Sequence, residues 1–340
     1  MSRRRAVPAI AAGVVVFVLL NAGLGLWADQ LPRIRDPYYG DKFVKLRAKA
    51  NRPDRGPLVV VYGSSRTGFA FNGTLVERTI RDAGGRAAAF NYGIPAMGPI
   101  GQLLYFRRTL ADGVRPDFVI VEVLPSMFAK SADGPREQHW MTGDRLLRRE
   151  LDTVERCGYS SPDVRGRWWE SSLVPVYGLR FQLLGRVIQS WIPWQFRQDW
   201  SRGTDESGWC TPYKDVITAD ERAFATAKAR DEYHAVLQTW QLDATLAATL
   251  DELLGECRSA GIPVKLLLMP ESGEFQAMYP ADVRRRIDAF VRGRGVPVID
   301  ARDWLAAGDF TDGHHQLRGG AETFSKRLAL EEILPWVNGR

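Results

Sequence analysis

Two adjacent serines and an aspartate–histidine pair have the residue types and spacing for nucleophilic chemistry. Ser64 and Ser65 directly follow the β-branched run in "VVVYGSSRTG", and Asp312 and His315 share the segment "FTDGHHQLRGG". A serine hydroxyl becomes a nucleophile at neutral pH only when a base takes its proton and a third group orients that base. One loop with Asp-x-x-His spacing can supply both groups, so we expect a Ser-His-Asp site.

The remaining histidines do not complete a metal site. His139 lies in an aromatic-rich segment and His234 on a long predicted helix, where we expect solvated or hydrogen-bonded structural histidines. His314 precedes His315, but no HxxxH spacing or carboxylate cluster completes a coordination shell. We therefore expect neither a metal nor an organic cofactor.

The three cysteines, Cys157, Cys210 and Cys257, lie too far apart in the sequence for a zinc knuckle. In an oxidising compartment Cys157 and Cys210 could form a disulfide, whereas Cys257 falls on a predicted helix and could be a buried thiol.

The N-terminus has the pattern of a membrane anchor. Arg3, Arg4 and Arg5 precede an uncharged stretch at 6–27, close to the roughly 20 residues that span a bilayer as a helix. The arginines should stay cytoplasmic, Trp27 suits the opposite interface, and residues from 29 onward would lie outside. A cleaved signal peptide would have a shorter apolar region and an A-x-A-like site, which "LGLWADQ" does not offer. We predict an anchor at 1–28 and a linker at 29–56.

Composition indicates a globular protein. The chain has 340 residues, of which 45% are hydrophobic and 25% charged, enough to bury a full core. Its net charge of +6 is modest, and the arginines are scattered rather than grouped with aromatic residues. We do not expect nucleic acid as a partner.

Short β-rich runs alternate with helical patterns over 57–340. The runs lie at 58–63, 87–93, 117–125, 263–270 and 296–300; helical spacing occurs at 74–83, 101–110, 281–293 and 320–337. Strands without polar alternation, joined by helices, predict a three-layer α/β/α domain with a mostly parallel, flavodoxin-like sheet.

The alternation stops at about 126–218, which we interpret as an insertion. It has no convincing central strand and is rich in tryptophan: Trp168, Trp169, Trp191, Trp194, Trp200 and Trp209. A capping box at Thr218 and Glu221 then predicts the start of a long helical region that ends at Gly261.

Three segments resemble the SGNH (GDSL-type) hydrolase superfamily. "VVVYGSSRTG", "FNYGIPAMG" and "FTDGHHQLRGGAETFS" are similar to its first, second and fifth blocks, and the resemblance covers about 57–125 and 260–335. Gly63-Ser64-Ser65 stands where the family has Gly-Asp-Ser. The resemblance therefore implies that Ser65 is the nucleophile, His315 the base and Asp312 its partner.

The chain departs from the family at its oxyanion donors. The resemblance implies backbone N–H donors from Ser65 and from Ala96 or nearby Gly93. The third block normally reads Gly-x-Asn-Asp and supplies an asparagine donor, but this chain reads "VEVLPSMF". Loss of such a donor costs on the order of 3 kcal/mol in a hydrolase. Arg66 or Ser126 could contact the substrate in its place.

A membrane-anchored branch of the family resembles this chain more closely. It includes alginate O-acetyltransferase-like proteins and the teichoic-acid D-alanylation protein with its Gly-Ser-Ser motif. The resemblance implies a single-pass protein of the cytoplasmic (inner) membrane with a periplasmic domain. That domain would pass an O-acetyl or other acyl group from a membrane-bound donor protein to a cell-envelope polysaccharide.

The sequence leaves three alternatives open. The same serine could hydrolyse the acyl ester instead of transferring it. A catalytically silent protein could use the cleft to bind glycan or to scaffold an envelope assembly. The tryptophans of 126–218 could stack on sugar rings, form a core or lie at the membrane interface.

Overall fold

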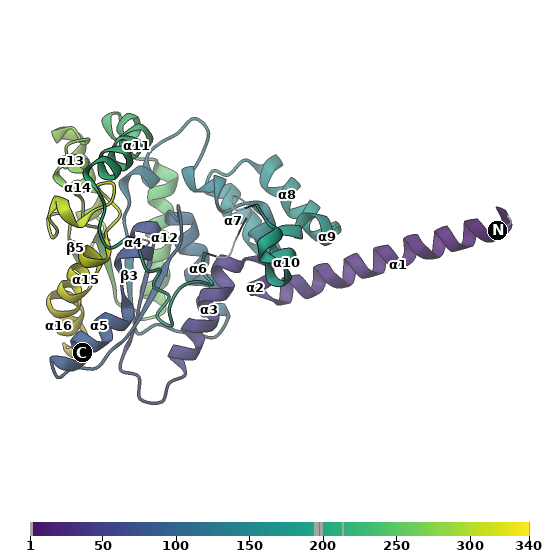
Figure 1. Cartoon of the computed structure of the whole chain (residues 1–340), viewed down its shortest axis with the longest axis horizontal. Helices are drawn as coiled ribbons and strands as arrows, with labels where there is room; N and C mark the ends of the chain where they lie inside the picture. The colour runs from purple at the N-terminus through teal and green to yellow at the C-terminus, as the bar shows by residue number, and fades with distance from the viewer. Residues whose placement is uncertain (1–2, 194–196, 198–199, 213, 340) are drawn as a thin grey trace. The chain divides into compact units, whose positions relative to one another are not determined.

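The computed structural model describes residues 3–193, 197, 200–212 and 214–339. The chain divides into two compact units, a smaller one made of residues 1–41 and 141–202 and a larger one made of residues 42–140 and 203–340 (Figure 1). Trp194 lies outside the described residues.

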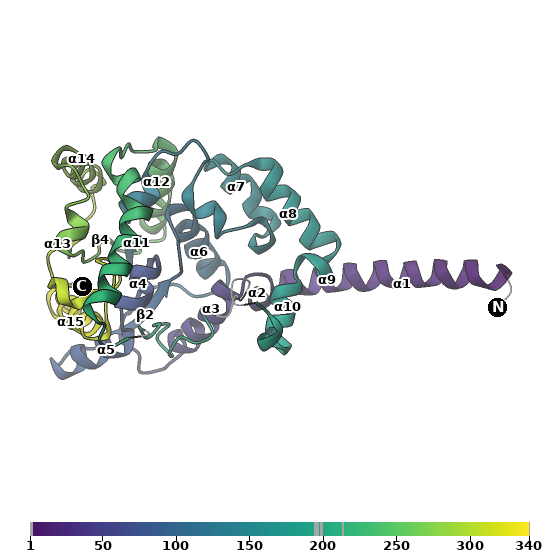
Figure 2. The same cartoon turned by 45° about the horizontal axis from the view of Figure 1, so that its top comes forward.

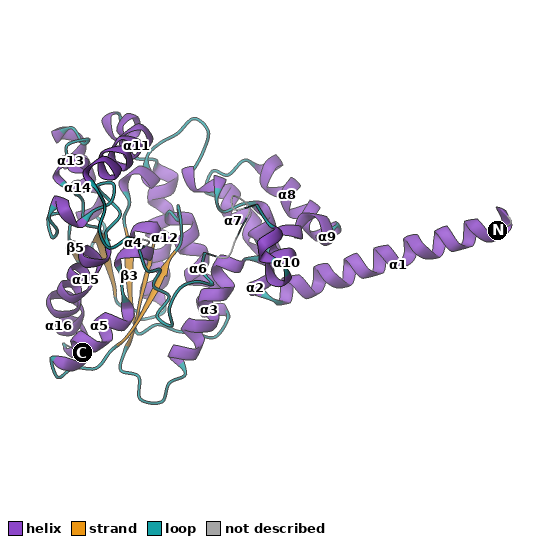
Figure 3. Ribbon diagram, in the orientation of Figure 1, coloured by secondary structure: helices purple, strands orange, loops and turns teal. Residues whose placement is uncertain are grey.

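A five-stranded, all-parallel sheet forms the centre of the larger unit (Figure 3). Its strands are β1 (Leu58–Gly63), β2 (Ala88–Gly93), β3 (Phe118–Glu122), β4 (Val264–Leu268) and β5 (Val298–Asp300). Their order, β2-β1-β3-β4-β5, is the flavodoxin-like order. The predicted fold class is confirmed, although four of the strands are shorter than the apolar runs that predicted them.

Helices cover both faces of this sheet. On one face, Val59, Val61 and Ile120 share a buried cluster with Phe324 and Leu328. That face is covered by α5 (Gly73–Asp82), α15 (Arg318–Arg327) and the π-helical turn Leu328–Ile333, which leads into α16 (Leu334–Asn338). The other face is covered by α6 (Pro99–Ala111) and α12 (Ala244–Ser259). Burial on both faces explains why the strands show no polar alternation.

The long helical region after residue 218 consists of two helices. α11 (Ala219–Gln238) begins at the predicted capping box of Thr218 and Glu221. The chain then breaks, and Asp243 caps the start of α12, which ends before Gly261. The predicted helical region is therefore interrupted at 239–243. The larger unit also contains α4 (Ser65–Ala70), α13 (Gly273–Gln276) and α14 (Ala281–Arg292).

The smaller unit is helical. It contains α1 (Arg3–Gln30), α2 (Pro32–Arg35), α7 (Leu151–Arg156), α8 (Ser161–Leu173), α9 (Pro175–Gly178) and α10 (Arg180–Val187), with short 3₁₀ turns between some of them. The helix over Ala6–Gln30 contains an 18-residue stretch with a mean hydropathy of 2.3 and is long and apolar enough to cross a membrane. The described residues of 126–218 form no strand, as the sequence predicted.

The region 29–56, expected to be a linker, is largely helical and contains α2 and α3 (Pro37–Ala50). Its Tyr39, Phe43 and Leu46 are buried at helical spacing, which explains why the segment is ordered. All three cysteines are buried free thiols, so the disulfide that we considered is not formed.

Candidate active site

The structure brings Ser65, His315 and Asp312 into one hydrogen-bonded chain. Ser65 is the first residue of α4, directly after β1, and the Asp312–His315 loop lies between β5 and α15. Ser65 Oγ lies 2.9 Å from His315 Nε2, and His315 Nδ1 lies 2.8 Å from Asp312 Oδ2. An ionised carboxylate can only accept hydrogen bonds, so Nδ1 carries the proton and the Nε2 lone pair faces the Ser65 hydroxyl.

The loop that carries His315 is held at two points. Asp312 Oδ1 accepts hydrogen bonds from the backbone N–H of His314 at 3.1 Å and of His315 at 2.8 Å. Gly313 has a φ of +92°, and a Cβ there would lie 2.8 Å from Ser272 Oγ. The Gly313 carbonyl accepts a hydrogen bond from the backbone N–H of Ser272 at 2.8 Å. Asp312 therefore orients the imidazole and also shapes its own turn.

The charges of this loop favour a basic imidazole. Burial opposes a positive charge on His315, but the Asp312 carboxylate and its hydrogen bond outweigh burial and raise the pKa of His315 above its ordinary value. Burial opposes charge on Asp312 as well, and the two neighbouring imidazoles reverse that effect and hold its pKa far below the usual range. His314 is buried beside His315, and both facts push its pKa well below the ordinary value.

Ser65, His315 and Asp312 are each partly exposed, whereas the adjacent Ser64 and His314 are buried. The His315 side chain is 26% exposed, and Ser65 is also partly exposed. The ring of Phe69 meets the His315 ring edge-on at 5.8 Å between centroids. A ligand can therefore approach Ser65 from solvent.

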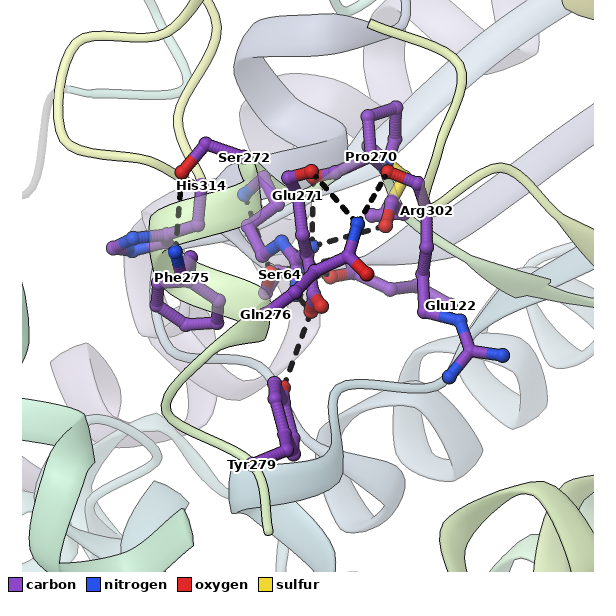
Figure 4. Close-up of polar contacts among 12 residues, drawn as sticks. Ser64, Glu122, Pro270, Glu271, Ser272, Phe275, Gln276, Tyr279, Arg302 and His314 are labelled. Atoms are coloured by element: carbon purple, nitrogen blue, oxygen red, sulfur yellow. Dashed lines mark hydrogen bonds and ion pairs between the residues drawn. The ribbon is translucent and has the colours of Figure 1, made fainter. Parts of the chain in front are cut away.

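Ser64 faces the opposite way, toward a buried carboxylate (Figure 4). Its hydroxyl donates to Glu122 Oε1 at 2.9 Å, and its backbone N–H donates to Glu122 Oε2 at 2.6 Å. Glu122 ends β3, is fully buried and also accepts the Thr67 hydroxyl at 2.7 Å. Glu122 was not predicted from the sequence as a site residue. The available signal was a single carboxylate within the otherwise apolar run "FVIVEVL".

Arg66 has a structural role, so the prediction that it contacts substrate is wrong. Its side chain is buried and donates to Glu271 at 3.2 Å and to the carbonyls of Met269 and Pro270 at 3.2 and 3.0 Å. The Tyr279 hydroxyl also donates to Glu271, at 3.2 Å (Figure 4). Arg66 thus ties α4 to the segment that follows β4.

Ser126, the other predicted substrate contact, is also buried and out of reach of solvent. It lies in the 3₁₀ turn Pro125–Phe128 after β3, whose side chains pack inward. This part of the prediction is wrong for the same physical reason as for Arg66.

The oxyanion donors proposed from the sequence differ in availability. Gly93 is wrong as a donor, because its N–H already donates to Asn91 Oδ1 at 2.8 Å. The N–H groups of Ser65 and Ala96 have no acceptor among the described residues. Ala96 is partly exposed and has a φ of +54°, a left-handed conformation that is uncommon for alanine.

Glu137 holds the turn that carries Ala96. This buried carboxylate accepts the backbone N–H of Gly98, Ile100 and Gly101, each at 2.9 Å, at the start of α6. A Cβ on Gly98 would lie 2.7 Å from Glu137 Oε1, so the close approach requires glycine. Burial raises the pKa of Glu137 to about 7 against the effect of these three donors. Glu137 was not predicted from the sequence as a site residue.

Potential metal-ligand atoms also meet in this loop. One such atom from each of Asp312, His314 and His315 lies within 4.8 Å of the others. His315 already uses both ring nitrogens in contacts with Ser65 and Asp312. A metal that took His315 as a ligand would therefore break the Ser-His-Asp chain.

No protein-family model matches the chain, and no curated protein matches it in sequence. Among solved structures, it is similar to a GDSL-like lipase from Bacteroides thetaiotaomicron, with 10% identity and a TM-score of 0.37, over 88% of this chain and 98% of that one. It is also similar to an alpha/beta hydrolase enzyme from the metagenome of Lake Arreo, Spain. That match has 12% identity and a TM-score of 0.36, over 82% of this chain and 97% of the other.

Proposed function

We propose that this protein is a membrane-anchored serine acyltransferase or esterase of the SGNH (GDSL-type) hydrolase superfamily, acting on acyl groups of an extracytoplasmic polysaccharide. The observation that carries the proposal is the hydrogen-bonded chain from Ser65 through His315 to Asp312. The motif resemblance supplies the family, and the parallel sheet with this chain at its carboxyl edge agrees with it.

In the first half-reaction, Ser65 Oγ attacks the carbonyl carbon of an acyl ester. His315 Nε2 takes the hydroxyl proton as the new C–O bond forms, and Asp312 stabilises the resulting imidazolium. The N–H groups of Ser65 and Ala96 are the candidate donors to the oxyanion. His315 then returns the proton to the leaving alcohol, which leaves an acyl group on Ser65.

In the second half-reaction, an acceptor hydroxyl attacks the acyl-Ser65 ester. His315 removes the acceptor's proton and returns it to Ser65 Oγ as the acyl group leaves. A sugar hydroxyl as acceptor gives transfer, and water gives hydrolysis. We favour a polysaccharide acceptor and a membrane-bound acyl donor because of the resemblance to the anchored branch. The apolar N-terminal helix supports anchoring, with the larger unit on the periplasmic side of the cytoplasmic membrane.

One observation favours a second candidate, a catalytically silent protein that binds glycan or scaffolds an envelope assembly. The third block lacks the asparagine that donates to the oxyanion in the family. β3 ends in Glu122, a carboxylate that accepts hydrogen bonds and is held beneath Ser64. A carboxylate cannot replace an oxyanion donor.

The test is a reaction of the full-length protein with 4-nitrophenyl acetate, with and without deacetylated alginate as a probe acceptor. Transfer predicts Ser65-dependent nitrophenol release together with O-acetyl groups on the polymer. Release without polymer acetylation would identify an esterase. If Ser65→Ala matches the wild type in both readouts, the proposed chemistry is contradicted. If neither protein releases nitrophenol or acetylates the polymer, the silent protein is favoured.

A further inference from the structure

The helices α8 and α9 of the smaller unit present an apolar surface to solvent. We call it the α8–α9 surface, and its members are Trp169, Leu173, Val174, Val176 and Tyr177. Leu173 is 64% exposed, Val176 54% and Tyr177 55%. The segment that joins the two helices, "SSLVPVYGL" at 171–179, contains no charged residue. Exposed apolar residues clustered in this way mark an interaction surface.

This surface lies beside the apolar helix α1, as Figures 1 and 2 both show. A Cβ on Gly25 would lie 2.9 Å from the Ser172 carbonyl oxygen and 3.8 Å from the Pro175 ring. Asn21, Gly25 and Ala28 are buried at helical spacing, so one stripe of α1 is covered. The α8–α9 joint therefore packs directly on the last two turns of the uncharged segment of α1.

The position of this contact along α1 determines how deep α8 and α9 lie in the bilayer. The uncharged segment 6–27 would be about 33 Å long as a helix, close to the roughly 30 Å of the hydrocarbon core. Residues 21 to 28 cover about the last 10 Å of it. Trp27, half exposed at the same level, suits the headgroup region. When α1 spans the bilayer, α8 and α9 cannot cover this stripe without meeting the lipid.

The charges next to the surface suit a lipid headgroup. The Arg180 guanidinium lies over the rings of Tyr177 and Phe181, at 4.2 and 4.6 Å from their centroids. Arg167 and Glu170 are also exposed on α8, on either side of Trp168 and Trp169 in the sequence. Aromatic and aliphatic side chains bordered by arginine are typical of helices that lie in a membrane interface.

We propose that the α8–α9 surface is immersed in the outer interface of the lipid bilayer beside α1. This inference rests on the membrane anchoring in the proposed function. It assigns Trp169 to the membrane rather than to a glycan. Trp168 and Trp209 are buried, and the Trp209 indole donates to the Phe69 carbonyl at 2.6 Å. The anchor and the α8–α9 surface would together fix the smaller unit at the membrane.

The test measures depth in full-length protein reconstituted in phosphatidylcholine–phosphatidylglycerol vesicles. The three native cysteines are changed to alanine, and an NBD fluorophore is placed by Val176→Cys. Matched labels at Val15→Cys in α1 and at exposed Phe224→Cys in α11 give the bilayer-core and aqueous references. Covalent labelling of Ser65 by a fluorophosphonate, in parallel samples, monitors folding of the larger unit.

The proposal predicts that shallow 5-doxyl lipid quenches the Val176 label more than deep 12-doxyl lipid does, with the reverse order for Val15 and no quenching for Phe224. A Val176 label that no doxyl lipid quenches, while the Val15 label is quenched, would overturn the proposal. A blue-shifted but unquenched Val176 label would also overturn it, in favour of a protein partner or second copy. If the Val15 label is unquenched as well, the anchoring itself fails.

Discussion

At the scale of single residues, the proposed catalysis depends on the carboxylate of Asp312, which holds His315 in one tautomer. Asp312→Asn keeps the size of the side chain but lets its amide face Nδ1, so Nε2 would carry the proton and could not accept one from Ser65. We expect kcat/KM for 4-nitrophenyl acetate to fall by about 10⁴-fold. A decrease of less than about tenfold, in a variant with unchanged circular dichroism, would contradict the assigned role.

The pH dependence of His315 follows from the same contact. Its pKa is raised above 6.5, so the imidazole becomes a free base only above that pH, and the acid limb of kcat/KM should lie there. The stability that its charge contributes is fully present below the unfolded pKa and is lost as pH rises through the folded pKa. In Asp312→Asn the effect of burial dominates, and the pKa of His315 should fall below 6.5. NMR titration of the His315 ring checks both directions.

A second residue-scale prediction concerns Glu122, which we infer positions the Ser64–Ser65 turn. Glu122→Gln turns an amide NH₂ toward the Ser64 N–H and the Thr67 hydroxyl, which are themselves donors. It also removes a negative charge that lies close to the Arg66 guanidinium. The free energy of unfolding should decrease by about 1–3 kcal/mol, and fluorophosphonate labelling of Ser65 should slow. Glu274→Gln, the same change at an exposed site on α13, is the matched control. Equal labelling rates in the two variants would show that Glu122 does not position Ser65.

At the scale of elements, the start of α6 is held by a buried carboxylate whose pKa is raised to about 7. Because the pKa of Glu137 is raised in the folded state, its carboxyl group contributes stability below the unfolded pKa near 4.5, and this contribution is lost as pH rises through 7. Glu137→Gln removes this titration. We therefore expect the wild type to lose about 3 kcal/mol relative to the variant between pH 4.5 and 7. Urea unfolding at both pH values measures the difference, and a constant difference would contradict the prediction.

The elements show what the sequence could predict. Unbroken apolar runs predicted the parallel sheet, and the helical spacing between them predicted its covering helices. Ser65 was found because it lies next to a strand end, and Asp312 and His315 were found because their spacing is a local pattern. Glu122 and Glu137 were missed because they act through contacts with backbone distant in the sequence, which only strand pairing and the turn before α6 create. Arg66 was misassigned because nothing local indicates that its partner, Glu271, lies after β4.

At the scale of the whole molecule, the proposed function places the chemistry at a membrane through the N-terminal helix. We expect the mature protein to retain residues 1–28, because the segment is long enough to span and lacks a cleavage pattern. Intact mass of the membrane fraction, after carbonate washing, should correspond to the uncleaved chain. A soluble product that begins near residue 28 would show that the segment is a signal peptide.

The central claim is that Ser65 is an activated nucleophile. Its most direct test is the intact mass of the full-length protein after exposure to a fluorophosphonate. We predict one covalent adduct in the wild type and none in Ser65→Ala. In Ser64→Ala the adduct should still form, but more slowly, because the Ser64 hydroxyl bonds Glu122 rather than His315. An adduct that persists in Ser65→Ala, or a wild type that forms none, would contradict the account.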